Sequence, residues 1–390
     1  MTAVAPEAPS IQRWPLAAAA VVTLVLFVHL TGQGAKSASL FAVGLGLGVA
    51  LYHAAFGFTG AWRRAIVDKD ISGVTAQLLM LAAAMLLFGP FLAQDAAFGH
   101  PVGGAFAPVS VSMALGALLF GIGMQLGGGC ASGTLFSAGG GSARMILVLV
   151  FFCLGAFWGS LDLRWWQTLP SLGVVSLGRE LGWPLAVPLQ LAALLLIYMG
   201  LRLYGGRNGR SLWPGGGLSW SMLLRGPWPL LLGAGLLALF NWATLMIAGH
   251  PWSITWAFSL WVAKAAAALG WDPATSSFWT GGFQARALTR PILADTTSVM
   301  NIGIILGAFV AATLAGKFAP RAKLPWPSLA AVVVGGLLMG YGARLAYGCN
   351  IGAFFSGVAS TSLHGWVWIL AAIPGNIIGV RLRPLFRLDA

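Results

Sequence analysis

Long runs of hydrophobic residues dominate this chain, and short polar or glycine-rich stretches separate them. Several runs reach the ~20 residues that a helix needs to cross a bilayer, while others are shorter. The chain lacks the sustained alternation of period two that marks a transmembrane β-barrel. The pattern predicts helical segments at 14–31, 38–57, 73–94, 109–126, 143–161, 184–203, 228–249, 252–270, 299–316, 328–346 and 363–380.

The first run, from Trp14 to Leu30, also has some features of a secretory signal. One basic residue precedes it, and the small-residue stretch TGQGAKSAS that follows could pass for a cleavage region. Together these features do not make a convincing cleavable signal. We therefore interpret the run as a retained first helix.

Composition leads to the same class of protein. Of the 390 residues, 58% are hydrophobic and 8% are charged, and the mean hydropathy is +0.85. This leaves too little polar surface to cover a soluble particle of this length. The sequence therefore predicts an all-α polytopic membrane protein, with the lipid bilayer as the partner of its outer surface.

The formal net charge of +13 comes from basic clusters at the ends of hydrophobic runs, at 63–69, 202–225, 317–323 and 381–387. The ordinary reason for such clusters is the bias of Lys and Arg toward cytoplasmic loops. We predict no nucleic-acid partner, although excess cations at a pore mouth would concentrate a permeating anion. The basic stretch 202–226 is also rich in Gly and Ser, which favours a linker.

An internal repeat relates the two ends of the chain. GALLFGIGMQLGGGCASGTLFS at 116–137 aligns without a gap with GGLLMGYGARLAYGCNIGAFFS at 335–356, and half of the positions are identical. FTGAW at 58–62 similarly echoes WTGGF at 279–283. Transporters built from two such halves place the substrate path between them, near the bilayer midplane. We therefore predict two pseudo-symmetric and inverted transmembrane repeats, at 1–201 and 227–390, joined by the linker at 202–226.

Each repeat carries one cysteine in a glycine-rich loop, Cys130 in GGGCASG and Cys349 in YGCNIG. Non-helical backbone at bilayer depth is tolerated only where protein buries it or where it lines water. The loops therefore predict re-entrant or half helices, in which glycine permits the turn and a following helix aims its N–H groups at an anion. We predict a chemical role for both loop cysteines and a packing role for Cys153, which has no counterpart. Close helix packing is the role we assign to glycines 121, 123, 340 and 342.

The paired cysteine loops, FTGAWRRAI and the ending GCNIGAFFSGVASTSLHGWVWILAAIPGNIIGVRLRP resemble the YeeE/YedE family of sulfur-transport membrane proteins, from about residue 40 to the C-terminus. The resemblance implies uptake of thiosulfate across the cell inner membrane, by helices and half-helices in pseudo-symmetric halves. It also implies that cysteine side chains contact the ion, and it places Cys130 and Cys349 in the two cysteine loops. A cytosolic sulfur-carrier protein is a further expected partner.

Thiols suit such an ion, because the S–H group is a weak donor and conduction demands that the ion can leave again. We expect backbone N–H groups of the loops to share the negative charge. Arg344, whose repeat partner is Gln125, is the candidate cation near the second loop. Besides the two cysteines and Arg344, the predicted path contains Gly129, Ala131, Gly348 and Asn350.

The sequence departs from the family pattern at one point. Members with the full thiosulfate pattern have a cysteine just ahead of the FxGAxR segment, where this chain has residues 55–58, AFGF. Two alternatives therefore stay open: a transporter of another sulfur or selenium species, and a membrane sulfurtransferase that passes persulfide sulfur between the cysteines to a cytosolic carrier. No His, Lys or Arg lies within four residues of either cysteine to activate a thiolate, so we favour transport without enzymatic chemistry.

Other polar groups lie within hydrophobic runs. Lys264 could pair with Asp272, line the cavity or reach the membrane interface. His53 and His364 could carry protons, although a histidine in an apolar chain is more often hydrogen-bonded scaffold. The Met and Trp residues suit packing and membrane interfaces, and we predict no metal, cofactor or nucleotide site.

Overall fold

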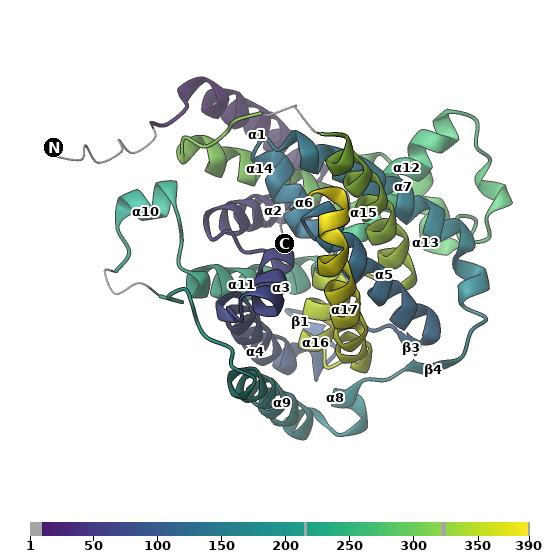
Figure 1. Ribbon diagram of the computed structural model, residues 1–390. Coiled ribbons are helices and arrows are strands. Elements are labelled where there is room, and N and C mark those ends of the chain that lie inside the picture. The colour runs from purple at the N-terminus through teal and green to yellow at the C-terminus, as the bar shows by residue number, and fades with distance from the viewer. Residues whose placement is uncertain (1–9, 214–216, 321–324, 389–390) are drawn as a thin grey trace.

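The computed structural model describes residues 10–213, 217–320 and 325–388. Within these ranges, ten helical segments are long and apolar enough to cross a membrane, which confirms the predicted all-α polytopic class. Their long helices are α1 (Arg13–Gln33), α2 (Ala35–His53), α4 (Ser72–Leu92), α5 (Val111–Gly127), α7 (Ala143–Trp166), α9 (Trp183–Leu203), α11 (Leu230–Ala248), α14 (Thr296–Leu314), α15 (Trp326–Leu345) and α17 (Leu363–Leu382) (Figure 1).

Shorter elements connect the long helices. The run predicted at 252–270 forms a helix of only 14 residues, α12. The short helices are α3 (Phe58–Val67), α6 (Ala131–Gly139), α8 (Leu177–Glu180), α10 (Trp220–Arg225), α12 (Thr255–Ala268), α13 (Gly282–Thr289) and α16 (Ser356–Ala359), with the π-helical turn η3 (Asn350–Phe355) and the 3-10 turns η1 (Pro273–Thr275), η2 (Ile292–Ala294) and η4 (Arg383–Phe386). Two small antiparallel pairs complete the fold: β1 (Ala96–Ala97) with β2 (His100–Pro101), and β3 (Pro108–Ser110) with β4 (Ser171–Val174).

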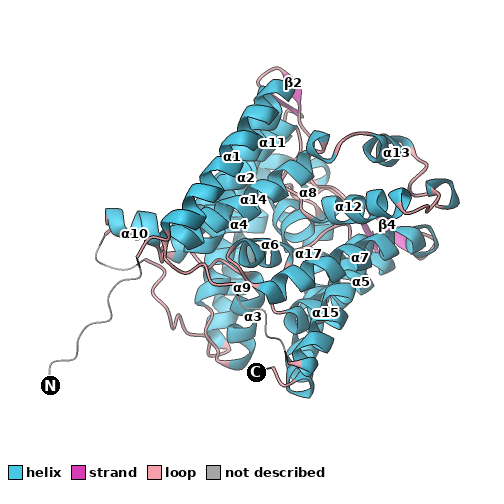
Figure 2. Cartoon of the chain, turned by 90° about the horizontal axis from the view of Figure 1, so that it is seen from above, coloured by secondary structure: helices cyan, strands magenta, loops and turns pink. Residues whose placement is uncertain are grey.

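The long helices pack in two groups, and each group mixes helices from both ends of the sequence. One group contains α2, α4, α11 and α14, and the other contains α5, α7, α15 and α17. α6, which follows the first cysteine loop, lies between the groups (Figure 2). α6 contacts α2 and α14 as well as α7, and α16 contacts both α4 and α17. Both cysteine loops are therefore held in the middle of the molecule.

Glycine lets the central helices α5 and α15 cross almost backbone to backbone. Gly116 faces Gly342 and Gly123 faces Gly335, and a Cβ added at any of these positions would lie 2.4–2.7 Å from the opposite helix backbone. Numbers rise along one helix as they fall along the other, so the two helices are antiparallel. The sequence repeat aligns Gly116 with Gly335 and Gly123 with Gly342. When each glycine is replaced by its repeat partner, the contact between Gly116 and Gly342 becomes the contact between Gly335 and Gly123. Inverted halves would place the helices in this way.

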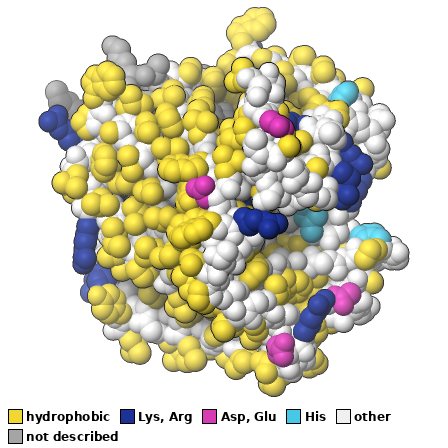
Figure 3. Space-filling view, turned by 90° about the vertical axis from the view of Figure 1, so that its right-hand side faces the viewer, with side chains coloured by type: hydrophobic (Ala, Val, Ile, Leu, Met, Phe, Trp, Pro, Cys, Tyr) yellow, Lys and Arg dark blue, Asp and Glu magenta, His cyan; other side chains and the backbone are white. Residues whose placement is uncertain are grey.

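Hydrophobic side chains cover the outer surface. On α7, they recur every three or four residues along the exposed side, at Ile146, Val150, Leu154, Trp158, Leu161 and Trp165. Such a stripe on the outside of the protein suits contact with lipid. Figure 3 shows one face on which hydrophobic side chains dominate, while charged side chains stand singly or in small groups.

Basic clusters meet at one end of the molecule. Ile71 and Arg207 are joined by an N–H to carbonyl bond of 2.9 Å, which links the turn between α3 and α4 to residues after α9. Arg383 donates to the carbonyl of Gln125, and the side chain of Gln125 donates to the carbonyl of Thr59 at the start of α3. Residues 214–216 of the predicted linker, and Arg321 and Lys323 of the third cluster, lie outside the described residues.

Candidate functional site

The two loop cysteines occupy equivalent places in the buried centre. Cys130 is the extended residue before α6, and Cys349 is the extended residue before η3. Each is only 1% exposed, and α6 contacts η3, so the two loops meet although they are far apart in the sequence. Cys153 is buried within α7, in the position that its predicted packing role requires.

The turn before each cysteine uses a residue with left-handed backbone. This residue is Gly128 in the first loop, with φ 85°, and Tyr347 in the second, with φ 59°. After Tyr347, the N–H of Gly348 donates to the carbonyl of Ala343 at 2.9 Å, which is the six-residue closure of a Schellman turn. The N–H of Gly348 is therefore engaged within the turn and is not free to bind an ion, contrary to the prediction.

Each thiol has a polar neighbour within the hydrophobic core. The sulfur of Cys130 lies 3.4 Å from the Ser132 hydroxyl, and the sulfur of Cys349 accepts from the N–H of Ile351 at 3.4 Å. Asn350 is fully buried, and neither atom of its side-chain amide has a partner among the residues that the structure describes. An unpaired buried amide is unusual in a folded protein, so Asn350 offers a free donor next to the second thiol.

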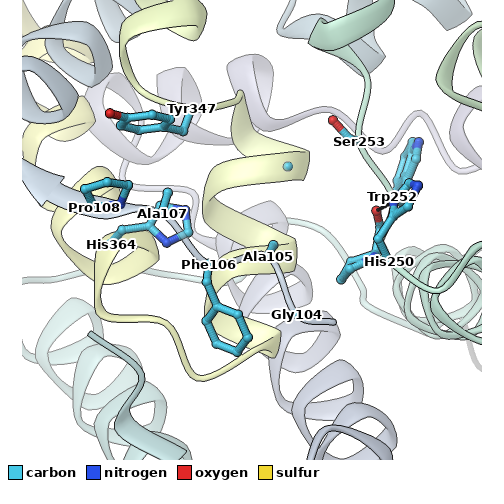
Figure 4. Close-up of a pocket in the computed structure, with 12 residues that line it drawn as sticks. Gly104, Ala105, Phe106, Ala107, Pro108, His250, Trp252, Ser253, Tyr347 and His364 are labelled. Atoms are coloured by element: carbon cyan, nitrogen blue, oxygen red, sulfur yellow. Dashed lines mark hydrogen bonds between the residues drawn. The ribbon is translucent and has the colours of Figure 1, made fainter. Parts of the chain in front are cut away.

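A cavity of about 400 Å³ lies beside the second cysteine loop. Its wall is built from the stretch before β3, the connection between α11 and α12, the second loop and the start of α17 (Figure 4). Gly352, three residues after Cys349, is part of the wall. The lining residues are Gly104, Ala105, Phe106, Ala107, Pro108, His250, Pro251, Trp252, Ser253, Tyr347, Gly352 and His364.

Buried amides hold the part of the wall between α11 and α12, which is non-helical. The side chain of Asn241 accepts from the N–H of Trp252 at 2.8 Å, and the side chain of Asn301 donates to the carbonyl of Ile254 at 3.0 Å. Ser356 donates to the carbonyl of Trp252 at 2.9 Å. These bonds satisfy backbone groups that water cannot reach. The sequence prediction missed both asparagines, although a lone amide inside a hydrophobic run was the available signal.

Two predicted charges do not join the site. The guanidinium of Arg344 lies 5.1 Å from the ring centre of Phe278, and Arg344 does not line the cavity. Lys264 donates to the carbonyls of Leu288, at 2.6 Å, and Arg290. Asp272 accepts from the N–H of Ala274, and among the described residues it forms no ion pair with Lys264.

The two histidines have different surroundings. His364 lines the cavity, and its Nδ1 lies 2.7 Å from the hydroxyl of Ser362. His53 lies at the end of α2, where its ring centre is 5.2 Å from that of Trp228. Of His53 and His364, it is therefore His364 that could touch an ion in the cavity.

Aromatic rings occupy the segment where the third cysteine of the family pattern is missing. Phe58 is fully buried, with its ring centre 6.4 Å from that of Phe354 in η3. Phe354 in turn stacks on Trp368 at 6.2 Å. None of these rings lines the cavity. The second loop is therefore flanked by the cavity and, separately, by an aromatic cluster.

Comparison with known proteins identifies the family. The chain is 29% identical over 347 residues to the thiosulfate transporter TsuA of Spirochaeta thermophila, which covers 86% of this chain and 95% of TsuA. It is 31% identical over 172 residues to the probable transporter YedE of Escherichia coli K12, which covers 44% of this chain and 41% of YedE. A family model described as sulphur transport matches residues 53–378. The chain therefore belongs to this family of non-enzymatic membrane transporters, as its resemblance to YeeE/YedE proteins predicted.

Proposed function

We propose that the protein takes up thiosulfate, or a related inorganic sulfur anion, across the cell inner membrane through a path lined by its two cysteine loops. One observation carries the proposal: Cys130 and Cys349 precede two helical segments that contact each other in the buried centre, beside a cavity. The names of the TsuA relatives supply the substrate class.

The distribution of charge supports a direction for the path. Basic clusters meet at the end of the molecule that carries α3 and the turn after it, and Lys and Arg are biased toward the cytoplasmic side. Among the residues that the structure describes, no Lys or Arg lines the cavity. The cavity then opens away from the cytoplasm and receives the ion, which passes Cys349 and Cys130 on its way in.

Weak contacts suit this task. An S–H group donates weakly, so two thiols would stabilise a partly dehydrated anion without trapping it as an ammonium group would. Asn350, the residue after Cys349, adds an uncharged and unpaired amide donor. After release, the ion would pass to a cytosolic sulfur-carrier protein, and co-purification of the transporter with such a carrier would test this association.

Uptake of labelled thiosulfate into membrane vesicles tests the path. Cys130→Ala and Cys349→Ala should each abolish most uptake while membrane insertion, followed by immunoblot, stays normal. Cys153→Ala is the matched control and should transport at the wild-type rate, because this buried thiol packs within α7. Wild-type uptake by both loop variants would refute the proposed path.

Competition tests the substrate, which matters because the third thiol of the family pattern is missing. Sulfite, sulfate and selenite are added in turn to the wild-type uptake assay. Thiosulfate should be the best ligand if two thiols and Asn350 suffice to bind it. If selenite or sulfite competes better than unlabelled thiosulfate, the protein carries a different sulfur or selenium species.

A further inference from the structure

We propose that the cavity beside the second cysteine loop is a reception site for a sulfur oxyanion, built from uncharged hydrogen-bond donors, with Tyr347 as one of its binding residues. The inference rests on the proposed function and adds to it a binding step before the thiols.

The wall offers donors without fixed charge. Ser253, Tyr347 and His364 contribute a hydroxyl, a phenol and an imidazole, and His250 lies at the same wall (Figure 4). In the described part of the chain, no Asp, Glu, Lys or Arg lines the cavity. The guanidinium of Arg179, which pairs with Asp95, lies over the ring of Phe106, 5.4 Å from the ring centre. An oxyanion would thus meet donors that bind it and no carboxylate that repels it, while the lack of a counter-charge lets it move on.

Tyr347 occupies a backbone position that favours glycine. Its φ of 59° places it in the left-handed region, at the point of the Schellman turn where most helices have glycine. The equivalent residue of the first loop is indeed glycine, Gly128. A bulky side chain kept at a strained position indicates a function for that side chain. Here the side chain forms part of the cavity wall.

One turn of η3 separates the cavity from the thiol. Gly352 is in the wall, and a Cβ added there would lie 3.4 Å from the hydroxyl oxygen of Ser253. The N–H of Ile351, one residue earlier, donates to the sulfur of Cys349. An anion held by Ser253 is therefore next to the segment that carries Cys349.

Two measurements on the full-length protein test the site. In vesicle uptake, Tyr347→Phe and Ser253→Ala should each raise KM for thiosulfate by about 2–10-fold, the effect of losing one hydrogen bond, with the maximal rate little changed. Tyr198→Phe on α9 removes a hydroxyl outside the cavity and should leave KM unchanged. By calorimetry, the Cys130→Ala/Cys349→Ala variant should still bind thiosulfate, and adding Tyr347→Phe should weaken that binding by the same factor.

The outcomes separate the inference from the proposed function. If thiosulfate uptake depends on both cysteines but Tyr347→Phe changes neither KM nor the affinity, the reception site is refuted and the cysteine path stands. If the wild type does not take up thiosulfate, the proposed function fails. Calorimetric titrations with sulfite, sulfate and selenite then test the reception site independently of uptake. Binding of one of these anions that Tyr347→Phe weakens supports the site, and no binding of any of them overturns it.

Discussion

At the scale of single residues, Asn350 distinguishes the chemistry of the second cysteine loop from that of the first, where Ala131 takes its place. The amide of Asn350 is fully buried without a partner among the described residues. Leaving a buried polar group unpaired costs about 1–3 kcal/mol. A transported anion that accepts a hydrogen bond from this amide would offset that cost.

We therefore expect Asn350→Ala to lower uptake without lowering stability. The loss of a hydrogen bond to a charged ligand, about 1.5–3 kcal/mol, should reduce kcat/KM for thiosulfate about tenfold or more, while Tm in detergent stays equal or rises. Asn241→Ala is the contrasting variant: its amide bonds the backbone of Trp252 and the hydroxyl of Ser356, so its Tm should fall. Full uptake by Asn350→Ala would mean that the amide does not contact the ion.

At the scale of helices, close approach depends on the absence of side chains. Gly342 of α15 meets the carbonyl of Gly116, so that a Cβ at position 342 would lie 2.5 Å from that oxygen. Because the obstacle is backbone rather than a flexible side chain, α5 and α15 would have to separate. These two helices lead directly into the two cysteine loops.

Gly342→Ala should accordingly impair folding and uptake together. Gly235→Ala on α11 is the matched control, since a Cβ there meets nothing within 4 Å and alanine favours the helix. The measurement is the yield of monodisperse protein together with Tm. Equal yield and Tm for both variants would show that the α5 and α15 crossing tolerates a wider separation.

Asp70 stabilises the turn between α3 and α4, outside the membrane-spanning segments. Its carboxylate accepts from the hydroxyl of Ser72, from the N–H of Ser72 at 3.0 Å and from the N–H of Gly209 at 3.1 Å, and it lies 3.5 Å from Arg64. Partial burial acts to raise the pKa of Asp70, but these hydrogen bonds and Arg64 together outweigh it, so the pKa lies below its ordinary value. The charged form of Asp70 therefore stabilises the folded protein.

Because the pKa is lower in the folded state, this stabilisation is present above the unfolded pKa of about 4 and is lost as pH falls through the folded pKa. Asp70→Asn should lower Tm at pH 7, and the difference from wild type should shrink on acidification below about pH 4. Asp68→Asn removes the same charge from an exposed side chain and should change Tm little. A Tm difference for Asp70→Asn that does not vary with pH would contradict the role of its charge.

At the scale of the whole molecule, the charge distribution and the cavity define two ends. Residues around 207–211 bond to the turn that carries Asp70, while β4 pairs with β3 next to the cavity wall. If the basic end is cytoplasmic, the two ends face opposite sides of the membrane.

Labelling with a membrane-impermeant thiol reagent on intact cells checks this orientation. In a background with all three native cysteines replaced by alanine, Leu172→Cys, at a site that is 76% exposed on β4, should react from outside. Ser211→Cys, which is also exposed, should react only after the membrane is opened. The reverse pattern would turn the cavity toward the cytoplasm.

The sequence by itself determined the properties that depend on local composition. Hydrophobic runs of sufficient length predicted the membrane-spanning helices, because transfer into lipid depends on the residues of one segment. The glycine-rich loops around Cys130 and Cys349 were also evident, since a break in a hydrophobic run is a local feature. Matching loops, together with the C-terminal stretch, were enough to predict the family.

Only the tertiary structure decided which groups meet. Arg344 is five residues from Cys349 in the sequence, yet it lies against Phe278 rather than in the cavity. From the sequence, the N–H of Gly348 was a candidate ion ligand, but in the structure it donates to the carbonyl of Ala343 within the turn. Tyr347 and Ser253, almost a hundred residues apart, share one cavity wall. These facts follow from the packing of helices that are distant along the chain, which hydropathy and spacing do not specify, because a side chain's partners depend on where other segments lie.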